Sequence, residues 1–399
     1  MTAFPMANMA EATRLTRLGR LKEAMALLKG QPSNVASADA QAGAEAPMEI
    51  LDLQPPSAPG GAWTAPLAGR SEKAPSGESR RSGSDGTRKG APLFKLDGVL
   101  SAKSRPSTPS IPAGARFDEA TFTNAAGSRT YKLYVPSGYD GRAVPLVMML
   151  HGCTQSPDDF AAGTQMNALA EEHVFLVAYP AQPQSANASK CWNWFNAGDQ
   201  QRGKGEPSLI AGITRQVMSQ FSVDEGRVYI AGLSAGGAAA AIMGSAYPDL
   251  YAAIGVHSGL ACGAAKDMPS AFAAMSQGGP PPSGRTDRPA APTIVFHGDR
   301  DRTVNPVNAD HVLAQSKGGA RLREIESQGK SKGGVSYRRT VQVDANDLPV
   351  LERWQVHGAG HAWSGGSPTG TYTDPTGPDA SREMVRFFLQ HRLAGVARG

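Results

Sequence analysis

Apolar runs that alternate with helical stretches set the pattern of the chain from about residue 116 onward. The runs lie at 130–136, 145–152, 174–180, 227–237, 252–259 and 293–301. Most of them are continuously apolar, as is typical of strands that are covered on both faces in a parallel sheet. Helical periodicity occupies 167–173, 209–220, 238–247, 309–315 and 381–393. The alternation of the two predicts an α/β fold in which helices flank a mostly parallel sheet.

Residues 1–30 follow a different pattern, and we assign them to an amphipathic N-terminal helix. Within 9–29 the apolar positions recur at three- and four-residue steps and therefore share one face: Leu15, Leu18, Leu21, Met25 and Leu28. Arginines and lysines occupy much of the remaining surface. Such a helix either packs on its own protein or on a second copy, or it docks through its apolar face on a hydrophobic granule or lipid surface.

Residues 31–112 lack apolar periodicity. They hold 11 of the chain's 30 prolines, together with many Ser, Gly and Ala residues. A segment of this composition buries too little apolar surface to offset the entropy lost on ordering, so we predict a disordered linker. The expected organisation is therefore an N-terminal helix, a linker, and an α/β domain over 113–395.

The strongest chemical signal is the motif GLSAG at 232–236, which matches G-x-S-x-G. It follows an apolar run and precedes an alanine-rich helical stretch, the context in which a serine sits on a sharp turn between a strand and a helix. The small residues Gly232 and Gly236 allow that turn to close, and the hydroxyl of Ser234 then projects at the positive end of the helix. We therefore predict that Ser234 is a nucleophile.

A serine nucleophile needs a general base and an acid, and on this fold the chain order is serine, acid, histidine. Asp299 and Asp301 follow one strand, and His357 and His361 follow a later one. We choose Asp301, whose place in HGxxDxxV is that of the acid on this fold, and expect Asp299 to shape the turn. We choose His361 as the base because it lies in a glycine-flanked loop, and expect His357 to pack or to bond backbone.

The transition state of acyl transfer also needs donors for its oxyanion. We expect one from the backbone N–H of Ala235 and one from the backbone N–H of Cys153, in the loop LHGCTQSPDDF, where Gly152 provides the turn. His151 precedes the serine and so breaks the expected order, and we predict that it braces this loop. The remaining histidines are expected to be packed or on the surface: His173, His257, His297, His311 and His391.

Aromatic residues gather in two loops near this chemistry. Trp192 and Trp194 lie in CWNWFN, and Trp363 follows the predicted base by two positions. Aromatic side chains in such loops either line an acyl or alcohol pocket or cap the core. We retain all three as candidate pocket residues.

Composition narrows the class of protein. Hydrophobic residues make up 40% and charged residues 19% of the chain, enough for a sizeable core. The net charge of +5 is spread along the chain, which argues against a nucleic-acid binder. No apolar run has the length of a membrane span and the N-terminus lacks a secretory pattern, so the cytoplasm is the expected location. Three cysteines without a CxxC pair argue against a cysteine zinc site.

Taken together, the motifs resemble the poly(3-hydroxybutyrate) depolymerase family of esterases. The similarity covers about residues 116–392 and is carried by LHGCTQSPDDFAAGTQMNALAEE, VAYPAQ, CWNWFN, GEPSLIAGITRQV, VYIAGLSAGGAAAA, HSGLACGAA, FHGDRDRTVNP and GAGHAWSGG. This family is an α/β-hydrolase group that also contains feruloyl and acetyl-xylan esterases. The resemblance implies the α/β-hydrolase fold and a serine carboxylic-ester hydrolase, and it carries the triad roles onto Ser234, Asp301 and His361.

The expected substrates are poly- or oligo-hydroxyalkanoate esters, with feruloyl or acetylated saccharide esters as the alternative. The triad requires neither a metal nor an organic cofactor. A peptidase or acyltransferase would use the same residues. Outside enzymes, the alternative is a granule-associated surface-binding protein with an idle sheet domain. Cys153 and Cys191 fall in two loops near the site, and we hypothesise a disulfide between them, which fits an exported protein better than a cytoplasmic one.

Overall fold

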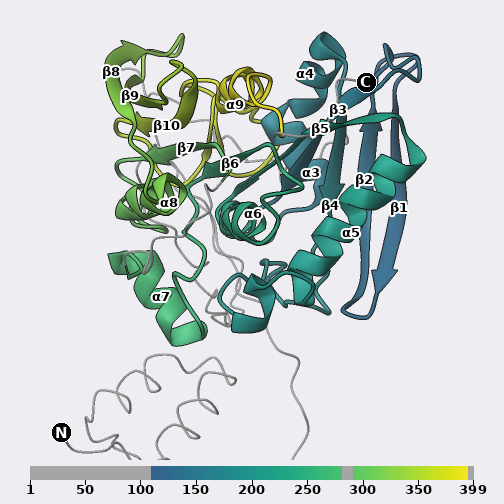
Figure 1. Cartoon of the computed structure of the whole chain (residues 1–399), viewed down its shortest axis with the longest axis horizontal. Coiled ribbons are helices and arrows are strands. Elements are labelled where there is room, and N and C mark those ends of the chain that lie inside the picture. The colour runs from purple at the N-terminus through teal and green to yellow at the C-terminus, as the bar shows by residue number, and fades with distance from the viewer. Residues whose placement is uncertain (1–108, 281–290, 394–399) are drawn as a thin grey trace, which may run out of the picture. The chain divides into compact units, whose positions relative to one another are not determined.

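One ten-stranded sheet organises the part of the chain that the computed structural model describes, residues 109–280 and 291–393 (Figure 1). In spatial order its strands are β1 (Arg116–Asn124), β2 (Gly127–Val135), β4 (Leu176–Pro180), β3 (Val144–Leu150), β5 (Val223–Leu233), β6 (Ala253–His257), β7 (Thr293–Gly298), β10 (Pro349–Val356), β9 (Ser336–Val343) and β8 (Arg323–Lys330). The six central strands, from β4 to β10, run parallel. Their carboxyl ends therefore share one edge of the sheet, where ligands bind in such folds.

Antiparallel strands complete both sides of the sheet. β1 pairs with β2 and β2 with β4, while on the other side β10 pairs with β9 and β9 with β8. Nearly every residue of β8 is exposed, and its sequence REIESQGK has no apolar alternation. No sequence pattern predicts such a strand, because neither of its faces contributes to the core. A separate short pair joins β11 (Trp363–Ser364) to β12 (Thr373–Asp374).

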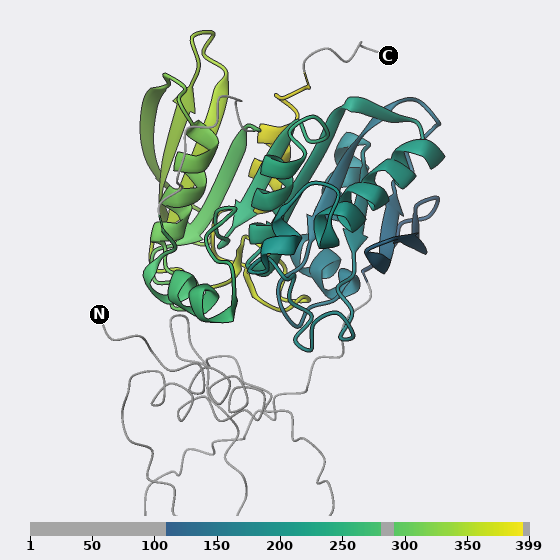
Figure 2. The same cartoon turned by 60° about the horizontal axis from the view of Figure 1, so that its bottom comes forward.

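Helices cover both faces of the sheet. One face carries α5 (Gly205–Gln220), α6 (Ala235–Ala246), α7 (Met268–Gln277) and α8 (Val307–Lys317), and the other carries α3 (Pro157–Thr164), α4 (Met166–His173) and α9 (Ala380–Phe388). A 3-10 turn, η1, spans Ala197–Gln200. Figure 2 shows the green and teal helices on the near face, with the yellow helix α9 behind the sheet.

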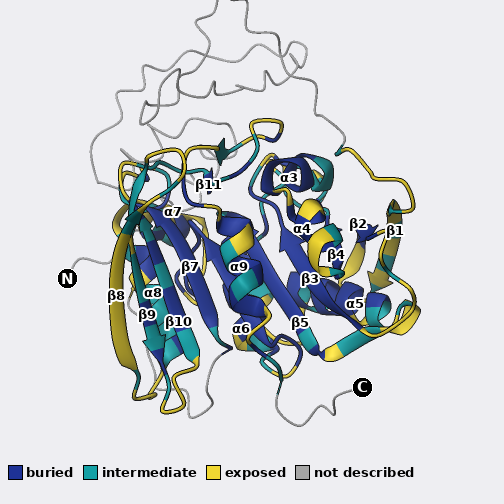
Figure 3. Ribbon diagram, turned by 90° about the horizontal axis from the view of Figure 1, so that it is seen from above, coloured by how far each residue is buried: buried dark blue, intermediate teal, exposed yellow. Residues whose placement is uncertain are grey.

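The central strands are buried on both sides, as their continuous apolar runs predicted. Along β3, Leu146 and Met148 belong to the hydrophobic cluster beneath α5 and α6, whereas Val147 and Met149 belong to the cluster beneath α3, α4 and α9. Successive side chains of a strand point to opposite faces, so a strand between two helical layers needs apolar residues at every position. Figure 3 shows this contrast, with the central strands buried and β8 exposed.

The structure confirms each strand and helix that the sequence patterns predicted within the described ranges. It adds elements without a clear pattern, among them α3, α7, β8 and β9. The predicted helix at 1–30 lies outside the described residues, as does the linker prediction up to residue 108, so these domain assignments and the 113–395 boundary stay predictions. Within the described ranges, no helix combines the length and the apolar character needed to cross a bilayer.

Candidate active site

Ser234 sits on the sharp turn between β5 and α6 that the motif predicts. Its backbone has φ 56° and ψ −118°, a strained combination for a residue with a side chain. Ala235 begins the helix directly after it. Ser234 is partly exposed, whereas Leu233 and Ala235 are buried. The turn therefore presents one side chain, the serine, at the carboxyl edge of the sheet and the N-terminus of a helix.

The two glycines of the motif are required by space. A Cβ placed on Gly236 would lie 2.1 Å from the carbonyl oxygen of Leu150, and one on Gly232 would lie 2.4 Å from the backbone of Gly236. Both contacts are to backbone of β3 or of the turn itself, which cannot move away as the end of a side chain could. This turn between β5 and α6, the nucleophile elbow, thus packs directly on β3, the strand that leads into the predicted oxyanion loop.

Asp301 and His361 come together although they are far apart in the chain. His361 Nδ1 lies 2.7 Å from Asp301 Oδ2, and the other carboxylate oxygen accepts the backbone N–H groups of Thr303 and Val304 at 2.8 and 2.9 Å. The Asp301 side chain is 0% exposed. Because Nδ1–H donates to the carboxylate, Nε2 of His361 keeps a lone pair that can accept a proton.

The buried Asp301 carboxylate is held in its charged form. Burial by itself raises its pKa, but the hydrogen bonds and charges of His297 and His361 outweigh burial, so the pKa of Asp301 falls well below its ordinary value. His297 Nε2 lies 3.4 Å from Asp301 Oδ2 and 2.9 Å from the carbonyl oxygen of Val304. The sequence predicted only a packing or surface role for His297, and its contact with the acid was missed.

The loops that carry Asp301 and His361 are fastened to each other beside the pair. Asp299 accepts hydrogen bonds from His357 Nδ1 at 2.8 Å and from the backbone N–H of Gly358 at 2.7 Å. The N–H of Arg300 donates to the carbonyl oxygen of Ala359 at 3.0 Å. Asp299 lies in the turn closed by the N–H of Asp301 and the carbonyl oxygen of Gly298, as expected, and its side chain binds the neighbouring loop as well. The expected packing of His357 is corrected, because its side chain is exposed and pairs with Asp299.

Ser234 is tied to the loop of His361 through His257, the last residue of β6. The backbone N–H of Ser234 donates to the carbonyl oxygen of His257 at 2.9 Å, and His257 Nε2 accepts the N–H of Ser364 at 2.9 Å. Ser364 follows His361 by three positions. Within the described residues, no hydrogen bond joins the Ser234 hydroxyl to His361; such bonds are often long before substrate binds.

His151 braces the loop after β3, as predicted. Its Nδ1 lies 2.7 Å from the carbonyl oxygen of Gly152, and its Nε2 accepts the N–H of Gln182 at 3.1 Å. Burial lowers the pKa of His151 to about 4 and keeps it neutral at pH 7. The N–H of Gly152 is occupied by Gln155 Oε1 at 2.9 Å and that of Thr154 by the carbonyl oxygen of Ser189 at 2.7 Å. The amide predicted to bind the oxyanion, that of Cys153, lies between these two.

Two further contacts fasten this loop to the segment after His361, and sequence patterns gave no sign of either. The side-chain amide of Gln155 donates to Asp159 and to the carbonyl oxygen of Thr371, both at 3.0 Å. The hydroxyls of Thr154 and Tyr372 lie 3.2 Å apart. Polar residues of this kind look like ordinary loop residues in a sequence, because their partners lie more than 200 positions away.

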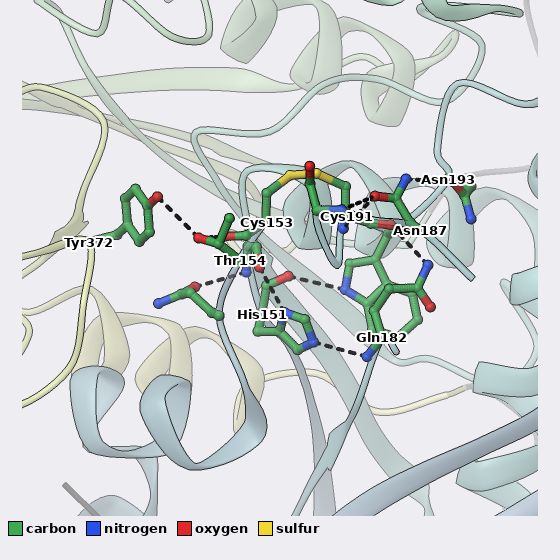
Figure 4. The surroundings of a disulfide bond; sticks show 12 residues. His151, Cys153, Thr154, Gln182, Asn187, Cys191, Asn193 and Tyr372 are labelled. Carbon is green, nitrogen blue, oxygen red and sulfur yellow. Dashed lines mark hydrogen bonds between the residues drawn. A yellow bond between two sulfur atoms is a disulfide. The ribbon is translucent and has the colours of Figure 1, made fainter. Parts of the chain in front are cut away.

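Cys153 and Cys191 form the hypothesised disulfide, shown with its surroundings in Figure 4. The bond joins the predicted oxyanion loop to a segment 38 positions later, with the two Cα atoms 4.2 Å apart. Asn187 in that segment accepts the N–H of Cys191 at 3.3 Å. The residue whose amide is the predicted oxyanion donor is therefore covalently restrained. The remaining cysteine, Cys262, is free.

We predict that denatured, unreduced protein has one reactive thiol, that of Cys262, and that prior reduction raises the count to three. The measurement is a colorimetric thiol titration in denaturant. A Cys262→Ser variant, with an expected count of zero before reduction, is the matched control. Three reactive thiols in the unreduced wild-type protein would contradict the bond.

Trp192 and Trp363 belong to the core, which corrects their prediction as pocket residues. Trp192 and Trp363 are 0% and 1% exposed, and Trp194 is 6% exposed. Trp192 Nε1 donates to the carbonyl oxygen of His151 at 3.1 Å, and Trp363 Nε1 donates to Ser381 at 3.0 Å. The side chains of Trp192 and Trp363 have almost no accessible surface with which to meet substrate. Trp192 and Trp363 instead stiffen their segments from below, since each indole joins core packing to a polar contact. Trp194 packs in the same core cluster as Trp192.

Comparison with known proteins assigns the chain to a protein family. The family model described as "Esterase PHB depolymerase" matches residues 129–342, more than half of the chain. The chain belongs to this family. The match spans the predicted nucleophile, the acid and the oxyanion loop, and it confirms the resemblance that the sequence motifs indicated.

Individual relatives agree with this membership. Poly(3-hydroxyalkanoate) depolymerase C of Paucimonas lemoignei is 34% identical over 264 residues, 63% of this chain and 61% of that protein. Feruloyl esterase B of Thermothelomyces thermophilus is 33% identical over 140 residues, 35% of this chain and 47% of that protein. The chain thus spans less than two thirds of the length of either relative.

A solved structure establishes the fold. The acetyl xylan esterase from Aspergillus awamori superposes with a TM-score of 0.54 at 20% identity, covering 68% of this chain and 99% of that one. At this identity the likeness speaks for the fold alone. Together with the parallel sheet and its two helical layers, it confirms the predicted α/β-hydrolase fold.

Proposed function

We propose that this protein is a serine carboxylic-ester hydrolase that acts through Ser234, His361 and Asp301. The observation that carries the proposal is the buried His361–Asp301 hydrogen bond of 2.7 Å, formed between two strand-end loops on the edge where Ser234 stands on its elbow. Membership of the esterase family supports the same reaction. No metal or organic cofactor is needed for this chemistry.

The reaction proceeds in two halves. In the first, Nε2 of His361 accepts the hydroxyl proton of Ser234 while the serine oxygen attacks the ester carbonyl carbon. The tetrahedral intermediate collapses when the imidazolium donates that proton to the leaving alkoxide, and an acyl-serine remains. In the second half, water loses its proton to His361, attacks the acyl carbon and releases the acid, and Ser234 regains its proton. The ionised Asp301 stabilises the imidazolium in both halves.

Two backbone amides are proposed to hold the oxyanion, those of Ala235 and Cys153. Ala235 is the first residue of α6, and the first N–H groups of a helix have no partner within it. The positive end of the helix adds a favourable field for negative charge. The N–H of Cys153 belongs to the loop that His151, Gln155 and the disulfide restrain. Donors fixed in advance need no reorganisation when charge develops.

For substrate, we propose poly- or oligo-hydroxyalkanoate esters. The support is the depolymerase relative, which is 34% identical over 63% of this chain, whereas a feruloyl esterase relative that matches a similar share, 60%, is 27% identical. Feruloyl or acetylated saccharide esters are the second candidate, favoured by the relatives named feruloyl esterase and acetylxylan esterase. A hydrophobic granule or lipid surface is proposed as a partner from the sequence of residues 9–29 alone, which lie outside the described ranges.

The location is also a proposal. A disulfide beside the active site favours an oxidising compartment over the cytoplasm, which the sequence had suggested by default. The thiol titration above bears on this point when it is carried out on protein recovered from its native host without reductant.

A panel of substrates tests the proposed function. We expect hydrolysis of 3-hydroxybutyrate oligomers and of p-nitrophenyl butyrate, with kcat/KM for the oligomers at least about tenfold above that for acetylated xylan or feruloyl sugars. Peptide p-nitroanilides should be turned over far more slowly. A preference for feruloyl or acetyl esters would change the proposed substrate to the second candidate. Turnover of amides alone would overturn the esterase proposal.

A further inference from the structure

His257 is hydrogen-bonded both to the nucleophile, Ser234, and to the loop that carries the base, His361. It ends β6, beside the carboxyl end of β5, and its side chain is buried. Its carbonyl oxygen accepts the N–H of Ser234 at 2.9 Å. The backbone of this residue therefore fixes the position of the amide that opens the nucleophile elbow.

The side chain of His257 reaches the loop of His361. Its Nε2 accepts the N–H of Ser364 at 2.9 Å, and its ring stacks on Trp363 with 5.1 Å between centroids and 25° between planes. The ring also stacks on Phe296 of β7, at 5.8 Å and 16°. The imidazole of His257 thus contacts Trp363 and Ser364, which follow His361 by two and three positions. It also packs on β7, the strand that leads to Asp301.

The bond to Ser364 needs one particular form of His257. An Nε2 that accepts an N–H carries no proton, so the neutral ring holds its proton on Nδ1, where Ser258 Oγ lies 3.2 Å away. Burial lowers the pKa of His257 well below its ordinary value, and the neighbouring His297 and His361 lower it further. The ring consequently stays neutral at pH 7 and the acceptor is always available.

We propose that His257 is a positioning residue of the hydrolase: its Nε2 holds the loop of His361 at the distance from Ser234 that proton transfer requires. This inference rests on the proposed function. The Asp299 contacts hold the same loop from the side of the acid, and His257 holds it from the side of the nucleophile. With one anchor on each side of His361, its imidazole has little freedom to swing away from the serine.

A pair of substitutions of similar length separates the acceptor from the packing. Gln at position 257 offers a carbonyl oxygen near the place of Nε2, whereas Met has the same reach without that acceptor. We expect His257→Met to lower kcat for p-nitrophenyl butyrate about 100-fold with KM within about twofold, and to slow labelling by a fluorophosphonate similarly. His257→Gln should recover most of both rates. His391→Met removes another buried histidine, outside the site, and should leave kcat within about twofold.

The results separate the possible failures. If the wild-type protein neither hydrolyses the ester nor reacts with the probe, the proposed function fails and this inference fails with it. If the wild type is active but the Met variant equals it, or the Gln variant loses as much as the Met variant, the positioning role alone is wrong. Thermal melting identifies a variant that does not fold, and His257→Asn, whose oxygen falls short of Ser364, then replaces His257→Met with the same expected loss.

Discussion

Ser234→Ala is expected to lower kcat for p-nitrophenyl butyrate by about 10⁴-fold or more, while the protein remains folded. The alanine removes only the hydroxyl oxygen that would carry the acyl group. Its Cβ is already present in serine, so the strained backbone at φ 56° and the contact of the turn with Leu150 are unchanged. The measurement is steady-state hydrolysis, with the melting temperature recorded on the same samples.

A second serine provides the control for this variant. Ser219 is exposed on α5, and its hydroxyl donates only to the carbonyl oxygen of Gln216. Ser219→Ala should therefore keep kcat within about twofold of the wild type. Retention of more than about a tenth of the wild-type kcat in Ser234→Ala would show that the elbow serine is not the nucleophile.

Asp301→Asn is expected to lower kcat by about 10³- to 10⁴-fold. The asparagine fits the same space and can still accept the N–H groups of Thr303 and Val304 through its oxygen. Its amide nitrogen then faces Nδ1 of His361 as a donor, so the imidazole must place its proton on Nε2, where it blocks acceptance of the serine proton. Steady-state kinetics with p-nitrophenyl butyrate measure the loss.

Asp299→Asn is the matched control, since Asp299 also pairs with a histidine, His357, and stands two positions from Asp301. The Asp299–His357 pair is partly exposed and binds loop to loop, so we expect a loss of about tenfold or less. If Asp299→Asn cost as much activity as Asp301→Asn, the choice between the two acids would be wrong.

The Asp301 variant also affects stability. The folded protein holds the pKa of Asp301 below its unfolded value, so the ionised carboxylate stabilises the fold above the ordinary carboxyl range. That contribution is lost only as the pH falls below that range and toward the lowered pKa. At pH 7, Asp301→Asn removes the whole of it, so its melting temperature should fall, and activity is to be compared below that temperature.

The central sheet and the elbow could be predicted from the sequence because both depend on local pattern. β3 is apolar at every position and β7 carries a central apolar run, and such runs indicate burial on two faces. The motif GLSAG is explained by local space, since Gly236 has no room for a side chain. β8 could not be predicted, because a strand exposed on both faces has no apolar pattern to show.

The part of the site that was mispredicted depends on long-range contacts. Trp192 and Trp363 were retained as candidate pocket residues, yet both are buried and hydrogen-bonded in the core. His257 and Asp299 resemble ordinary strand-end residues, and only the folded chain brings them to Ser364 and His357. The sequence pattern predicted the reacting groups. It could not predict the contacts that orient them, because these form between segments that are far apart in the chain.

The most direct test of the account is to find where an active-site-directed fluorophosphonate becomes attached. We expect one adduct, on the tryptic peptide that contains Ser234, detected by mass spectrometry. The adduct should be absent in Ser234→Ala and should form much more slowly in Asp301→Asn. An unlabelled wild-type protein, or an adduct on a different residue with Ser234 unmodified, would contradict the proposed hydrolase.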